Sequence, residues 1–128
     1  MKFFLGLILF FGFLQLFQID RENPPIDKSK EIQAPQEVAN ILKRGCYDCH
    51  SNETTYPLYS YIAPISWVIS NNIKNGRKAL NFSSFADMDE GLKKLRLDRF
   101  EQTIKSGLMP KPAYMKFHPE ARLIKEEI

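Results

Sequence analysis

Apolar side chains recur at helical spacing in three stretches of the chain, and proline or glycine separates these stretches. The first stretch begins at Pro35, a residue that favours the first turn of a helix. Val38, Ile41 and Leu42 then fall on one face, and Gly45 marks the end. This spacing predicts a short amphipathic helix over residues 35–45.

The second and third stretches predict two longer helices. One runs from about Ile65 to Gly76, and the other runs from Asp87, a helix-capping residue with Glu90 three positions later, to Ser106. The expected apolar face of the second helix is Ile65, Val68, Ile69 and Ile73. The expected buried stripe of the third is Leu92, Leu95, Phe100, Ile104 and Leu108. Each stripe needs a packing partner, so these helices should belong to one core.

The rest of the chain shows little periodicity. We expect Gly107 to stop the third helix, Pro110 and Pro112 to keep the following segment extended, and Pro119 to start a last helical turn. No stretch alternates strictly between apolar and polar residues, as a half-buried strand would. The pattern therefore predicts a small all-α domain.

An apolar run precedes these stretches, from Phe3 to Ile19, and Lys2 is its only flanking charge on the N-terminal side. As a helix it would span about 25 Å, near the lower limit for the hydrocarbon core of a bilayer. No small residue stands where a signal peptidase would cleave. We therefore expect residues 1–19 to form an uncleaved transmembrane signal anchor with Lys2 on the cytoplasmic side.

Residues 20–34 are polar, contain Pro24-Pro25 and lack an apolar period, so they are predicted to be a linker. Residues 35–128 then form one domain. The formal net charge of the chain is +3, and charges of both signs are interspersed after residue 19. A nucleic-acid partner is therefore not expected.

The two cysteines of the chain stand in Cys46-Tyr47-Asp48-Cys49-His50, the C-x-x-C-H pattern of a covalently attached c-type haem. Two thiols on one helical turn reach the two vinyl groups of one porphyrin edge, and the His50 imidazole can then ligate the iron. The small helical fold is thus predicted to be cytochrome c-like, with its loops around one haem. Such attachment occurs in the periplasm, so we expect a single-pass protein of the bacterial inner membrane with a periplasmic haem domain.

A zinc site, a structural disulfide and a redox dithiol fit this cysteine pattern less well. A zinc ribbon would need a second pair of ligands, and only His118 is left over. A structural disulfide across two intervening residues would be strained. A redox dithiol of the thioredoxin type is the main alternative, but no strand leads into the motif.

Iron held by one histidine has a sixth position. The candidate side chains are Met88, Met109, Met115 and His118, and an open site is the fifth option. Met109 stands between Gly107 and Pro110, directly after the predicted third helix, in a loop that can present its thioether. The sequence favours Met109, and His118 is the alternative for a bis-histidine iron.

The order and spacing of several motifs over about residues 35–125 resemble a family of bacterial cytochrome c-like haem-binding domains. The motifs are Cys46-Tyr47-Asp48-Cys49-His50-Ser51-Asn52, Tyr59-Ser60, Ile62-Ala63-Pro64, Ser66-Trp67, Gly76-Arg77, Leu80-Asn81-Phe82-Ser83, Gly107-Leu108-Met109-Pro110, Tyr114 and His118-Pro119-Glu120-Ala121-Arg122. The resemblance implies a single haem with His50 as proximal and Met109 as distal ligand, in a periplasmic module often attached to a membrane.

Three further side chains are candidate donors to the haem propionates, namely Trp67, Arg77 and Tyr114. The alternative is that Trp67 belongs to the core and that the Arg77 guanidinium is simply solvated.

These features predict an electron carrier, because iron with histidine and methionine ligands changes oxidation state without needing a substrate pocket. Redox proteins of unknown identity are its expected partners. The alternative is a gas or redox sensor with an open or displaceable sixth site. An enzyme such as a peroxidase is not expected, since His118 and scattered carboxylates are the only distal acid–base candidates.

Overall fold

The computed structural model describes all 128 residues, and every regular element in it is helical. The α-helices are α1 (Lys2–Leu14), α2 (Gln36–Gly45), α3 (Tyr47–His50), α4 (Ile65–Ala79), α5 (Glu90–Lys105) and α6 (Pro112–Phe117). The short 3₁₀ helices are η1 (Lys28–Lys30), η2 (Leu58–Tyr61), η3 (Phe82–Asp87), η4 (Pro119–Ala121) and η5 (Lys125–Glu127). The helical class is as the sequence predicts.

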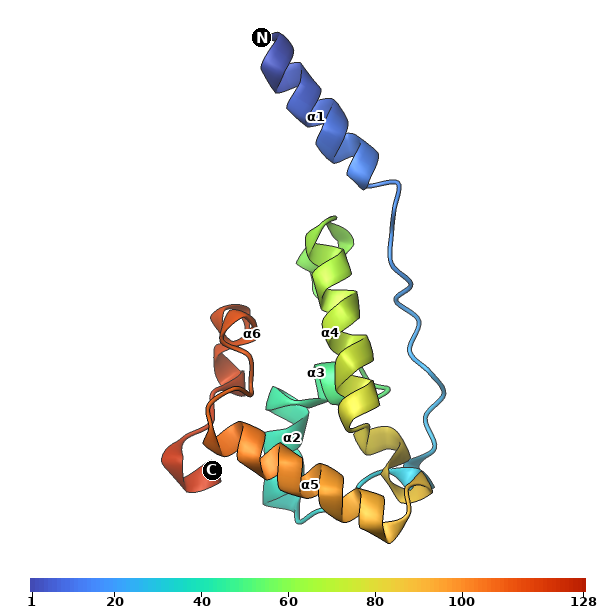
Figure 1. Cartoon of the computed structure of the whole chain (residues 1–128), viewed down its shortest axis with the longest axis vertical. Coiled ribbons are helices and arrows are strands. Elements are labelled where there is room, and N and C mark those ends of the chain that lie inside the picture. The colour runs from blue at the N-terminus through green and yellow to red at the C-terminus, as the bar shows by residue number, and fades with distance from the viewer.

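The structure corrects the interpretation of the N-terminal run. α1 has 13 residues and projects away from the other helices (Figure 1). It is about 20 Å long, against about 30 Å for the hydrocarbon core of a bilayer. The helix ends where the Gln15 side chain turns to the backbone of Ala63, accepting from its N–H at 2.9 Å and donating to its carbonyl at 3.0 Å.

None of the helices is both long enough and apolar enough to cross a membrane. The predicted transmembrane anchor over residues 1–19 is therefore wrong. The predicted single-pass location in the bacterial inner membrane, with the haem domain in the periplasm, depended on that anchor and is overturned with it.

The segment predicted as a linker, residues 20–34, runs along the helical body (Figure 1). The Arg21 guanidinium donates to the carbonyl of Ser60 at 2.7 Å, and the Asn23 amide donates to the carbonyl of Thr54 at 2.9 Å. Polar side chains thus fasten this segment to the domain, which a composition rich in polar residues alone does not reveal.

A small core surrounds the C-x-x-C-H segment. Its buried members are Leu42, Tyr47, Leu80 and Phe82. The rings of Tyr47 and Phe82 stack with centroids 5.4 Å apart, and the Tyr47 hydroxyl donates to Glu31 at 2.8 Å. Since Tyr47 is the first residue of α3, this core fixes the helical turn that carries the motif.

α4 crosses α3 at close range, and Gly76 makes this crossing possible. A Cβ atom at Gly76 would overlap the carbonyl group of Cys49, with the carbonyl carbon at 2.9 Å. α4 was predicted in the right place, but its buried residues are Ser66, Ile73 and Gly76, whereas Ile65 and Val68 are exposed. The face that packs is therefore set by the small residues that let two backbones approach.

α5 differs from its prediction at its start and in its buried face. Its N-cap is Asp89, whose carboxylate accepts a backbone hydrogen bond at 2.9 Å, because residues 82–87 including Asp87 form η3 instead. Gly107 ends the helix as predicted, with a positive φ of 71°. No residue of α5 is buried, and Leu95 and Leu108 of the expected stripe are exposed.

The C-terminal region is more helical than predicted. α6 forms where an extended segment was expected, because Pro112 stands in the first helical turn, where its missing N–H costs nothing. The last residues then fold onto α2 (Figure 1). There the Arg44 guanidinium donates to the carbonyl of Glu120 at 2.9 Å and pairs with Glu127 at 2.5 Å.

Candidate haem-binding site

A cavity of about 270 Å³ lies between the C-x-x-C-H segment and α5. Three residues predicted to bind a haem line it together, namely Cys46, His50 and Met109. The other lining residues are Gly45, Ala79, Leu80, Arg96, Arg99, Phe100, Thr103, Ile104, Pro110 and Leu123. The wall is thus largely apolar, with a few groups that can bind iron or an anion.

A second cavity of about 500 Å³ adjoins the first. The two share Ile104, Met109, Pro110 and Leu123, and the second adds residues that include Met115, Lys116 and Arg122. Together they fall within the range of about 300–1,000 Å³ that small-molecule and cofactor sites occupy. Met109 stands in the wall common to both.

His50 is held in the orientation that a metal ligand requires. Its Nδ1 atom lies 2.9 Å from the carbonyl oxygen of Leu80, to which a protonated Nδ1 donates. Nε2 is then left as the free donor for iron. Burial lowers the pKa of His50, and this outweighs the opposite effect of hydrogen bonds to the carbonyls of Leu80 and Gly76. The imidazole is therefore neutral at neutral pH, as ligation demands.

The two cysteines are free and partly buried. Burial raises the pKa of Cys46 to about 11 and that of Cys49 to about 11, and each is raised further by a neighbouring negative charge. Both are therefore thiols at neutral pH, unlike the low-pKa thiolates of redox-active pairs. Cys46 lines the cavity, whereas Cys49 packs against Gly76 of α4. No group of three or more His, Cys, Asp or Glu side chains converges as a metal site would require.

The three methionines proposed as a sixth ligand lie in different surroundings. Met109 is partly buried and lines both cavities, Met115 lines the larger one, and Met88 packs against the small core. The loop after Met109 is tied to α4, because the Lys111 ammonium donates to the side-chain oxygen of Asn72 at 2.7 Å. Of the three, Met109 alone shares a cavity with His50.

His118, the bis-histidine alternative, has both ring nitrogens engaged elsewhere. Its Nε2 lies 2.6 Å from the Tyr59 hydroxyl, and its Nδ1 lies 3.2 Å from Glu120. The ring also stacks on Tyr114 at 4.2 Å between centroids. Tyr114 in turn donates to Asp48, inside the C-x-x-C-H motif, at 2.7 Å. This cluster supports the motif from outside the cavity.

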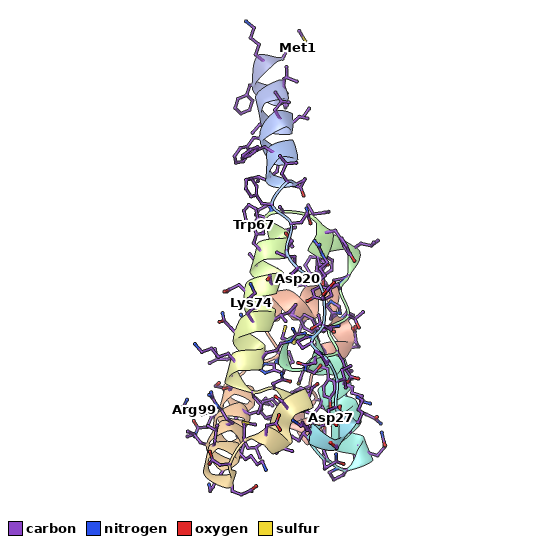
Figure 2. All side chains as sticks on the ribbon, turned by 90° about the vertical axis from the view of Figure 1, so that its right-hand side faces the viewer. Met1, Asp20, Asp27, Trp67, Lys74 and Arg99 are labelled. Carbon is purple, nitrogen blue, oxygen red and sulfur yellow. The ribbon has the colours of Figure 1, made fainter.

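The remaining propionate candidates lie away from both cavities. The Arg77 guanidinium donates to the carbonyl of Ser51 at 2.7 Å and to the Thr54 hydroxyl at 2.9 Å, which fixes the segment after the motif. The Trp67 indole donates to the carbonyl of Phe17 at 2.8 Å. Figure 2 shows Trp67 at the end of α4 that faces α1, and Arg99 near the opposite end of the molecule.

Among the groups that sequence reasoning missed are the Leu80 carbonyl, which orients His50, and Arg96 and Arg99, which line the cavity. For the arginines a signal was present, because Arg96, Arg99 and Thr103 recur at helical spacing. These residues lie on the same side of α5 as Phe100 and Ile104 of the predicted stripe, which line the same cavity. For Leu80 no signal existed, since the contributing group is a backbone carbonyl.

The residues present fit an iron porphyrin. A neutral imidazole with a free Nε2 and a thioether can ligate iron. The largely apolar wall suits a flat apolar ring, and the two guanidinium groups can bind carboxylate substituents. The porphyrin would also extend a core that has few buried side chains, since 16 of 128 residues are buried.

Comparison with known families agrees with this fit. A family described as a haem-binding domain matches residues 9–128, which is nearly the whole chain and includes part of the segment predicted as an anchor. Comparison with curated proteins gives no match, and neither does comparison with solved structures. The resemblance inferred from the sequence motifs is confirmed, and haem with its iron is the cofactor. The chain belongs to the haem-binding domain family.

Proposed function

We propose that this protein is a one-electron carrier with a single c-type haem. Cys46 and Cys49 attach the haem through thioether bonds, His50 is the proximal iron ligand and Met109 the distal one. The observation that carries the proposal is that His50 and Met109 line one cavity, while the Nδ1 atom of His50 is held by the Leu80 carbonyl. When bound, the haem iron supplies reversible one-electron chemistry.

The two thiols are suited to attachment without a redox step. In each, the S–H group would add across a vinyl C=C bond of the porphyrin, with sulfur bonding to one carbon and the hydrogen passing to the other. Neither an oxidant nor a leaving group is required. The short α3 turn keeps both cysteines in the positions that its packing against Tyr47, Phe82 and Gly76 defines.

His50 and Met109, as the residues that would hold the iron, would favour electron transfer over ligand binding. A thioether stabilises ferrous iron relative to ferric iron and raises the reduction potential. The Lys111–Asn72 hydrogen bond anchors the segment after Met109 to α4, which also carries the carbonyl partner of His50 at its end. Both proposed iron ligands are therefore tied to α4, which limits their movement when the iron changes oxidation state. A redox protein is the corresponding partner.

The ferric absorption spectrum and carbon monoxide binding test this assignment. The wild-type protein should show the weak long-wavelength charge-transfer band of methionine-ligated ferric haem, and its ferrous form should bind carbon monoxide slowly. Met109→Ala should abolish the band, lower the reduction potential and allow rapid binding.

The matched controls are His118→Ala and Met115→Ala, which should keep the band. Loss of the band in Met115→Ala, with Met109→Ala unchanged, would assign the sixth position to Met115. A wild-type protein that lacks the band, and whose iron spectrum changes in His118→Ala, would assign it to His118. Rapid carbon monoxide binding by a wild-type protein without the band would instead indicate a sensor with an open site.

A further inference from the structure

Half of the arginines in the chain lack an intramolecular partner, and all of these line the two cavities. The chain has six arginines, of which Arg21, Arg44 and Arg77 are fixed by hydrogen bonds from their guanidinium groups. The guanidinium groups of Arg96, Arg99 and Arg122 have no hydrogen-bond or ion-pair partner in the chain. The three arginines without a hydrogen-bond or ion-pair partner therefore all lie at the candidate haem site.

On α5, each acidic side chain forms an ion pair with a lysine. Lys93 pairs with Glu90 at 2.7 Å, and Lys94 pairs with Asp98 at 2.9 Å. Lys105 pairs with Glu101 at 2.5 Å. These are all the carboxylates of the helix, and none of them forms an ion pair with Arg96 or Arg99. Neither cavity is lined by an Asp or Glu side chain.

Arg96 and Arg99 stand three residues apart on α5, and both line the smaller cavity, the one that contains Cys46 and His50. Arg96 is partly buried and Arg99 is exposed, so the pair marks the cavity rim. Figure 2 shows Arg99 on α5, away from the end of the molecule where Trp67 meets α1.

We propose that Arg96 and Arg99 bind the two propionate carboxylates of the haem. The assignment rests on the proposed function, because thioether bonds to the cysteines hold the vinyl edge of the porphyrin, and the propionates project from the opposite edge. Cys46 lines the cavity from the α2–α3 side and the arginines line it from α5. A guanidinium binds a carboxylate with two parallel hydrogen bonds, and it keeps its charge at any physiological pH.

The larger cavity offers the competing pair, Lys116 and Arg122. That cavity is lined by neither His50 nor Cys46. A porphyrin ligated by His50 would therefore occupy the cavity that Arg96 and Arg99 line. Substituting the α5 pair or the Lys116–Arg122 pair distinguishes the two assignments of the propionate-binding residues.

The test is the reduction potential of the purified holoprotein measured against pH, together with the propionate-bending bands in the resonance Raman spectrum. Arg96→Gln/Arg99→Gln should lower the potential, because two positive charges that oppose ferric iron are removed. It should also introduce a dependence of the potential on pH near neutrality, because propionates without cationic partners titrate at higher pH. The Raman bands should shift, and Arg96→Lys/Arg99→Lys should retain most of the wild-type potential.

Lys94→Gln on the same helix is the matched control and should leave the potential and the Raman bands unchanged. If the glutamine pair accumulates no holoprotein, each single variant should show a smaller shift of the same sign. Wild-type potential and Raman bands in the arginine variants would overturn the proposal, as would the predicted shifts appearing in Lys116→Gln/Arg122→Gln instead. Covalent haem content is measured first on every sample, so that a failure of haem attachment is recognised separately.

Discussion

The Nδ1 atom of His50 lies 2.9 Å from the carbonyl oxygen of Leu80, thirty residues later in the chain. Leu80 follows the last residue of α4 and has an extended backbone, so its carbonyl is not used within that helix. A buried carbonyl acceptor at Nδ1 selects the tautomer whose Nε2 is free to bind a metal. The end of α4 therefore determines how the imidazole of the C-x-x-C-H motif is presented.

The first prediction concerns the close crossing of α4 over this motif. Gly76→Ala places a Cβ against the carbonyl group of Cys49, so either α4 or the motif must shift. We expect a loss of about 1–3 kcal/mol in the free energy of unfolding, with a lower yield of covalently attached haem. Thermal denaturation and haem content measure the two effects.

The control for this substitution is Gly12→Ala in α1, another helical glycine with no atom within 4 Å of the added Cβ. It should not lower the melting temperature, since alanine favours a helix more than glycine does, and it should leave the haem content unchanged. Equal behaviour of the two variants would show that the crossing tolerates a larger residue and that Gly76 does not position the motif.

The second prediction concerns Tyr114, whose hydroxyl donates to Asp48 at 2.7 Å. Tyr114→Phe removes a hydrogen bond to a carboxylate between the two cysteines, and should cost about 1–2 kcal/mol of stability. Because Tyr114 belongs to the helix that follows the Met109 loop, the methionine–iron band should also weaken. Tyr61→Phe is the control, since that ring is 53% exposed. A stable variant with an unaltered band would mean that this contact does not support the loop.

The third prediction concerns the dependence of stability on pH at Glu31. Burial raises the pKa of Glu31, but the hydrogen bond from Tyr47 and the charge of Lys28 outweigh this, so the pKa lies below its ordinary value of 4.5. A carboxylate with a depressed folded-state pKa contributes stability above its unfolded-state pKa, and this contribution is lost as the pH falls through the folded-state value. The protein should therefore lose stability below about pH 4.5.

Glu31→Gln should be less stable than the wild type at pH 7, by about 1–2 kcal/mol, and should lose less stability on acidification. Urea unfolding at pH 7 and at acidic pH measures both differences. Glu22→Gln is the control, because Glu22 is exposed and its side chain has no partner. An acid response of the Glu31 variant equal to that of the wild type would contradict the role assigned to this carboxylate.

The features that could be predicted from the sequence depend on residues close together in the chain. The motif Cys46–His50 lies within five residues and predicts haem attachment, and α2 is bounded by Pro35 and Gly45, which act on their own turn of helix. The end of α1 could not be predicted, because it depends on Gln15 meeting Ala63, forty-eight residues away. The same limit applies to the Leu80 carbonyl, since a backbone group leaves no trace in the sequence.

Predictions from residue type alone were also wrong for side chains around the site. Trp67 and Arg77 are plausible propionate donors by type, but each is committed to a backbone carbonyl outside the cavities. On α5, Phe100 and Ile104 of the predicted stripe do line the cavity, but Arg96 and Arg99 line it beside them, and Leu95 and Leu108 of the stripe are exposed. A helix that packs on a cofactor need not show the apolar stripe of a helix that packs on protein.

The proposed electron carrier depends on covalent attachment of haem through Cys46 and Cys49, and the mass of the denatured polypeptide tests that attachment. Protein produced together with a c-type haem attachment system should be heavier than its sequence by the mass of one haem. A tryptic peptide containing both cysteines should carry that mass, and Cys46→Ala/Cys49→Ala should lose it. A denatured polypeptide with only the mass of its sequence, released from haem by acid–acetone extraction, would contradict covalent attachment.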